Sequence, residues 1–283
     1  MDDYTKWNTG FRFSRRLVTL GILIFAILVL TVIFVSGLLT PPAAYEVNFQ
    51  EKNLIPGIRH PFGTDWLGRD MLARTIKGLS TSIIVGMSAS VVSTIMAMIL
   101  GVAAATMGRK VDTFVTWFVD LFLSIPHMIL LILISIAVGK GFLGVLIGVA
   151  ATHWTSLTRV IRAEVLALRS QPYITASRAL GKGHLWIGRK HILPHVLPQF
   201  IVALILLFPH AILHEAAITF LGFGLSPEQP AIGVILSESM QYLTAGMWYL
   251  AFFPGLCLLV VVMLFDALGE NLRILLNPGT SQT

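Results

Sequence analysis

The chain has 283 residues, of which 55% are hydrophobic and 12% are charged, and its mean hydropathy is +0.81. Soluble globular domains carry about a quarter charged residues, so this composition excludes an ordinary soluble domain. The net charge of +6 is also seen in nucleic-acid-binding proteins. Basic residues in the cytoplasmic loops of a membrane protein explain it better, so we expect no nucleic-acid partner.

Six apolar segments are long enough to cross a lipid bilayer as helices, which takes about 20 residues each. They lie at about 17–39, 80–107, 112–138, 141–158, 196–222 and 247–268. The first follows Arg15 and Arg16 as a signal peptide would, but its apolar core exceeds 20 residues and the stretch LLTPPAAYE is a poor small-residue cleavage site. We therefore expect it to be retained. The sequence predicts an all-α, polytopic membrane protein with six transmembrane helices.

Basic residues are distributed unequally between the two sides of this arrangement. With the N-terminus inside, the inner segments hold 14 of the 20 Lys and Arg residues and the outer segments hold 6. This asymmetry predicts that both termini are cytoplasmic. The outer segment 223–246 has no basic residue and includes Glu228 and Glu238. It predicts a mildly negative face toward an entering cation.

The longest inner segment, 159–195, holds half of the inner basic residues. It breaks at Gln171-Pro172, and the pattern predicts a helix over 173–180, a turn at Gly181 and a second short helix that ends at Pro194. Such a segment could rest on anionic lipid. It could also be a rigid knob that another protein pushes. The chain has no phosphate-binding loop, so ATP chemistry would have to come from another polypeptide.

The order of residues in this segment resembles the coupling motif of permease subunits of ATP-binding-cassette importers. That motif reads Glu-Ala-Ala, three residues, Gly, then about ten residues and Leu-Pro. Here Thr replaces the acid and Ser replaces the second Ala. The residues that the resemblance assigns to ATPase coupling are Tyr173, Thr175, Ala176, Ser177, Arg178, Gly181, Leu193 and Pro194.

Three further stretches resemble the second permease subunit of the peptide/nickel importer family. They are GTDWLGRD at 63–70, FLGFGL at 220–225 and GENLR at 269–273, so the resemblance extends over about 60–277. It implies the type I ABC importer permease fold in a prokaryotic cytoplasmic (inner) membrane, and a transport subunit that is not an enzyme.

The resemblance also implies an organisation and a set of partners. The chain divides into a cytoplasmic N-terminus (1–16), a first transmembrane helix (17–39), an extracytoplasmic segment (40–78) and a permease domain (79–283) with its coupling loop at 172–194. The expected partners are a homologous second permease, two ATPase subunits, an extracytoplasmic binding protein and the lipid bilayer. ATP would bind to the partner subunits, and this chain would bind no cofactor of its own.

Three polar residues, His210, His214 and Glu215, interrupt the apolar segment 196–222. On a helix the two histidines lie one turn apart on one face, so both could bind one metal ion, and Glu215 lies about 100° round from His214. Imidazole suits nickel, copper, zinc or iron(II). Pro209 could kink the helix there. The His-x-x-x-His before Phe-Leu-Gly resembles nickel permeases of the family, so we expect Ni²⁺ as the transported substrate, free or chelated.

Other interpretations of these histidines remain open. An oligopeptide or dipeptide permease of the same family could line a wet cavity with them, or they could only stabilise helix packing. A self-contained channel or secondary carrier would be expected to have inverted repeats, and none is visible. Weaker pathway candidates are Asp120, His127 and His153. Asp120 could bond across the bundle, His127 follows a proline, and His153 is more typical of an interfacial anchor together with Trp154.

Overall fold

The computed structural model describes residues 15–276, and that part of the chain is helical and has no β-strand. The long helices are α1 (Arg15–Leu39), α2 (Met71–Thr106), α5 (Phe142–Arg169), α8 (Leu193–Phe220) and α10 (Tyr249–Leu276). The shorter helices are α3 (Arg109–Leu123), α4 (His127–Val138), α6 (Pro172–Ala179), α7 (His184–Ile187) and α9 (Ile232–Met240). Two 3₁₀ turns, Pro42–Tyr45 and Phe49–Glu51, follow α1, and a π-helical turn, Gly188–Ile192, joins α7 to α8.

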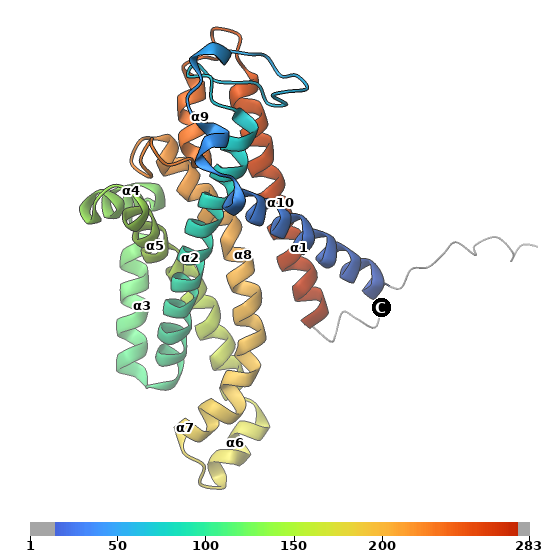
Figure 1. Ribbon diagram of the computed structural model, residues 1–283. Helices are drawn as coiled ribbons and strands as arrows, with labels where there is room; N and C mark the ends of the chain where they lie inside the picture. The colour runs from blue at the N-terminus through green and yellow to red at the C-terminus, as the bar shows by residue number, and fades with distance from the viewer. Residues whose placement is uncertain (1–14, 277–283) are drawn as a thin grey trace, which may run out of the picture.

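Helix α2 forms the centre of the bundle and contacts α1, α3, α5, α8, α9 and α10. In Figure 1 α9 lies near one end of the bundle, α6 and α7 lie at the other, and α1 slants away to one side. Small residues let the helices approach α2 closely. A Cβ added at Gly101 would lie 2.9 Å from the Ile161 side chain, and one at Gly86 would lie 3.2 Å from the Phe208 ring. Close approach of this kind is how membrane helices gain packing energy.

The expected all-helical membrane fold is confirmed, but the spans differ from the six predicted. Within 15–276, α1, α2, α8 and α10 are long and apolar enough to cross a membrane. A fifth span results if α3 and α4 are counted together, although they are bent by 94°. Helix α5 is long enough, but buried polar residues such as Thr152, Thr155 and Thr158 reduce its hydropathy. Residues 1–14 of the predicted cytoplasmic N-terminus lie outside the described residues.

Three helix boundaries differ from the prediction for local reasons. The span expected over 112–138 is not one continuous helix, because the chain turns at Ser124-Ile125-Pro126, where proline disfavours helix in the preceding residue. Helix α2 begins at Met71 rather than near 80, because the Asp70 carboxylate accepts a hydrogen bond from the Ala73 amide at 2.8 Å. The helix after Gly181 does not end at Pro194 but continues as α8, which also runs through Pro209.

A buried network of charged side chains fixes the end of the bundle near α9. Arg74 donates to Asp65 at 2.9 Å and to Glu238 at 2.8 Å, and Arg69 donates to the same two carboxylates at 2.6 and 3.0 Å. Asp65 is fully buried. The Trp66 ring stacks on Tyr242 with centroids 4.5 Å apart. Because two arginines neutralise Glu238, the predicted negative face toward a cation is wrong for this residue.

Candidate functional site

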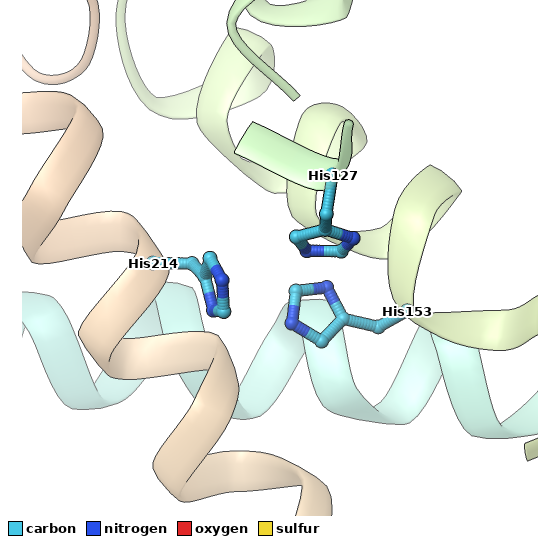
Figure 2. A group of neighbouring side chains, drawn as sticks. All are labelled: His127, His153 and His214. Atoms are coloured by element: carbon cyan, nitrogen blue, oxygen red, sulfur yellow. The ribbon is translucent and has the colours of Figure 1, made fainter. Parts of the chain in front are cut away.

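Three histidines from three different helices converge inside the bundle. His127 is the first residue of α4, His153 lies within α5 and His214 lies within α8. Their ring centroids are 4.7, 4.7 and 4.9 Å apart, and one ring nitrogen of each lies within 4.8 Å of the other two. Figure 2 shows the rings facing one another across a small space. This is the one group of three or more metal-ligand side chains among the described residues.

The bend between α3 and α4 and the close packing of α4 on α5 bring these residues together. The turn at Pro126 directs the start of α4, and therefore His127, toward α5. Helix α4 lies against α5 because Gly148 has no side chain; a Cβ there would lie 3.1 Å from the Leu131 carbonyl oxygen. His153 lies just over one turn beyond Gly148 on α5. The site therefore depends on a glycine that carries no ligand atom.

Hydrogen bonds orient two of the three rings. His153 Nδ1 lies 2.9 Å from the Val149 carbonyl oxygen, and His214 Nδ1 lies 2.7 Å from the His210 carbonyl oxygen. A carbonyl oxygen only accepts, so each Nδ1 carries a hydrogen, and in the neutral ring this leaves the lone pair on Nε2. Metal-binding histidines use the same arrangement, in which the second ring nitrogen donates to a backbone carbonyl.

Two ring nitrogens of the cluster have no hydrogen-bond partner among the described residues. They are Nε2 of His127 and Nε2 of His153, and both are buried. Buried polar atoms are nearly always hydrogen-bonded, so two unpartnered ring nitrogens in one cluster point to a ligand. Imidazole nitrogens suit a borderline divalent metal ion.

The spacing of the cluster is compatible with one metal ion. Three nitrogens bound to one ion at about 2.1 Å each lie about 3.5 Å from one another. The ring nitrogens here lie within 4.8 Å of one another, so at most a small inward movement of the rings brings all three to one ion. Three ligands also leave coordination positions open for water or another ligand. Open positions fit a site that holds an ion briefly.

The structure distributes the predicted residues of α8 differently from the expected pair. His210 is exposed, and it contributes its backbone carbonyl rather than its ring to the cluster. Glu215 is fully buried and outside the cluster. One of its oxygens accepts from Thr219 Oγ1 at 3.1 Å, and the other has no partner in the described residues.

Of the weaker candidates, Asp120 lies outside the cluster and His153 lies within it. Asp120 pairs with Arg159 of α5, as the expected bond across the bundle requires, and both side chains are half exposed. The interfacial-anchor interpretation of His153 and Trp154 is wrong, because both are buried. Trp154 packs between Phe118 and Phe122, with its ring centroid 5.5 Å from each.

The segment predicted to couple to an ATPase forms a hook at the end of the bundle remote from α9 (Figure 1). Gly181 has a φ of +78°, which L-residues with a Cβ rarely adopt, and it turns the chain between α6 and α7. Ser177 is half-buried, and its hydroxyl lies 3.2 Å from Nε2 of His191. The other predicted coupling residues are exposed: Tyr173, Thr175, Ala176, Arg178, Gly181, Leu193 and Pro194.

Comparison with known proteins identifies the relatives of this chain. Residues 94–274 match the family of binding-protein-dependent transport system inner membrane components. The chain is 31% identical to the nickel transport system permease protein NikC of Escherichia coli K12 over 265 residues, which are 94% of this chain and 95% of that protein. It is 30% identical to the dipeptide transport system permease protein DppC of Bacillus subtilis 168 over 256 residues, which are 90% of this chain and 80% of that protein.

A solved structure supports the same fold. The methionine ABC transporter MetNI, in an inward-facing conformation, includes a chain that matches with a TM-score of 0.58 and 21% identity, covering 73% of this chain and 98% of that one. At this identity the match bears on the fold alone. With the relatives above, it shows that the chain belongs to the inner-membrane permeases of peptide and nickel ATP-binding-cassette importers, with a type I importer permease fold.

Proposed function

We propose that this permease carries nickel across the cytoplasmic membrane and that His127, His153 and His214 are the ligands along its path. The observation that carries the proposal is the pair of buried, unpartnered Nε2 atoms in a cluster of three facing rings. Relatives do not decide the substrate, because nickel and dipeptide permeases are equally similar to this chain. Ionisable residues inside a membrane protein mark substrate pathways by default.

The chain would work as one of two permeases in an ATP-driven importer. The exposed hook of α6 and α7 would receive two ATPase subunits, and an extracytoplasmic binding protein would deliver the substrate at the end near α9. The distribution of charge supports this orientation, because the hook, at the end remote from α9 in Figure 1, carries Arg178, Lys182, Arg189 and Lys190. Both termini would then be cytoplasmic.

The cluster would hold the ion while access changes from one side to the other. In their neutral form, the two carbonyl-bonded rings would present their Nε2 lone pairs to the ion. A set of only three protein ligands would keep binding weak enough for release, and a relative movement of the helices would change the number of rings in reach. No covalent chemistry on this chain is needed, because the energy comes from ATP hydrolysed on partner subunits.

Peptide import is the second candidate. Oligopeptide permease OppC of Bacillus subtilis 168 is 30% identical over 270 residues, which are 94% of this chain and 86% of that protein. In this case the three histidines would line a hydrated cavity and bond to a peptide terminus. Substitution of a single ring would then reduce peptide uptake and leave nickel uptake at background.

The test is uptake of radioactive nickel by cells that carry the complete importer, with labelled peptide uptake measured in parallel. We expect His153→Ala and His214→Ala to lower nickel entry at least tenfold, because each removes a ligand. His210→Ala is the matched control. It lies on the same helix and keeps the carbonyl that orients His214, so nickel entry should persist.

Two results would contradict the nickel proposal. One is equal loss for His210→Ala and His214→Ala. The other is peptide uptake without nickel uptake by the native importer. Assembly and ATP hydrolysis of each variant are measured alongside, so that a loss of nickel entry is not confused with a loss of the complex.

A further inference from the structure

A groove on the outer side of α3 combines positive charge with exposed aromatic rings. It has a volume of about 760 Å³ and is lined by Arg109, Lys110, Thr113, Phe114 and Trp117. Phe114 is 62% exposed and Trp117 is 57% exposed, and their ring centroids are 6.1 Å apart. The two basic residues stand at the start of α3, and the rings follow one and two turns later.

The charges of this groove are not compensated by the acids of the same helix. Asp112 accepts hydrogen bonds from Arg162 of α5, one of them at 2.7 Å, and Asp120 pairs with Arg159 of α5. Both acids of α3 are therefore used in holding α3 to α5. Arg109 and Lys110 are exposed and form no ion pair within residues 15–276. The groove keeps two positive charges beside an apolar surface.

We propose that this groove binds an anionic phospholipid, with the headgroup phosphate at Arg109 and Lys110 and an acyl chain over Phe114 and Trp117. Charge complementarity selects the headgroup, since anionic lipids of the inner leaflet attract basic residues at the membrane surface. Phe114 and Trp117 lie about 7.5 Å and about 12 Å along the helix from Arg109, a depth at which acyl chains begin. The proposal rests on the proposed function only for assigning this end to the cytoplasmic side.

The first test is native mass spectrometry of the purified complete importer after titration with phosphatidylglycerol or with phosphatidylcholine of the same chains. We expect retained phosphatidylglycerol, and about 25-fold weaker retention when Arg109→Gln and Lys110→Gln are combined, at about fivefold for each charge. The matched control is Arg189→Gln with Lys190→Gln, which removes an identical, exposed Arg-Lys pair from the hook. Equal losses in the two double variants would overturn the proposal, because binding would then follow overall charge.

A second measurement locates the acyl chain and does not depend on the charge variants. Brominated phosphatidylglycerol should quench the fluorescence of Trp117. The native importer should therefore be quenched more than Trp117→Phe. This difference should be larger with brominated phosphatidylglycerol than with brominated phosphatidylcholine. Equal differences for the two lipids would contradict the proposal. A second result would also contradict the proposal: the double variant of Arg109 and Lys110 loses pairing with the second permease while its lipid retention is unchanged. The groove would then bind the second permease rather than a lipid.

Neither measurement involves metal, so the result is independent of the nickel proposal. His214→Ala should leave lipid retention unchanged. A failure here would leave metal uptake as proposed, and a failure of metal uptake would leave the groove as proposed.

Discussion

The bundle buries polar side chains in two regions, the charged network near α9 and the histidine cluster. Only in the network near α9 do these side chains have partners of opposite charge. Arg69 and Arg74 each contact Asp65 and Glu238, and no distance in that network exceeds 3.0 Å. In the cluster, two ring nitrogens have no partner in the described chain. A network in which every polar group has a partner, here called saturated, holds helices together. A cluster that leaves polar groups unpartnered is less stable by itself and gains more when a ligand supplies the missing partner. The two regions therefore have different purposes, and substitutions should separate them.

The largest effect is expected from the saturated region. Arg74→Gln removes two charge-assisted hydrogen bonds and leaves the fully buried Asp65 with one cation, which should lower the free energy of unfolding by about 3 kcal/mol. Thermal unfolding of the purified importer in lipid nanodiscs measures this. Arg59→Gln is the control, because Arg59 is 89% exposed and lies 3.9 Å from Glu51. Unchanged Tm for Arg74→Gln would remove the distinction between the two regions.

An intermediate effect is expected from the packing that supports the cluster. Gly148→Ala places a methyl group 3.1 Å from the Leu131 carbonyl oxygen, between the helices that carry His127 and His153. We expect a loss of stability of about 1–2 kcal/mol and severalfold lower nickel uptake. Gly101→Ala creates a similar clash, 2.9 Å from Ile161, away from the cluster. It should cost similar stability with little loss of uptake, and equal loss of uptake would show that general overpacking is responsible.

The smallest effect on stability is expected within the cluster itself. His153→Leu removes a buried nitrogen that has no partner, and the Val149 carbonyl can keep its helical bond. The free energy of unfolding should change by less than about 1 kcal/mol, while nickel uptake is lost. Parallel measurement of Tm and uptake checks this. A large fall in Tm would indicate that His153 is a packing residue.

The sequence alone predicts most of the helices, but it does not predict which residues of different helices come into contact. Apolar runs and the Gly181 turn predicted most elements, since these signals are local. The three histidines were all noticed, but His127 and His153 belong to different helices and no periodicity relates them to His214. Their convergence depends on the bend at Pro126 and on the close approach at Gly148. The same holds for Arg74 and Glu238, which are 164 residues apart in the chain.

Helix α8 gives the importer a lever arm. It is unbroken from Leu193, where the hook ends, to His214 and beyond. At 1.5 Å per residue these positions are about 32 Å apart, so a tilt of one degree at the hook displaces His214 by about 0.6 Å. Metal–nitrogen distances in a site are held to within about 0.2 Å, so a displacement of this size is enough to make or break one bond to an ion. A tilt of about one degree could thus determine whether His214 reaches an ion in the cluster.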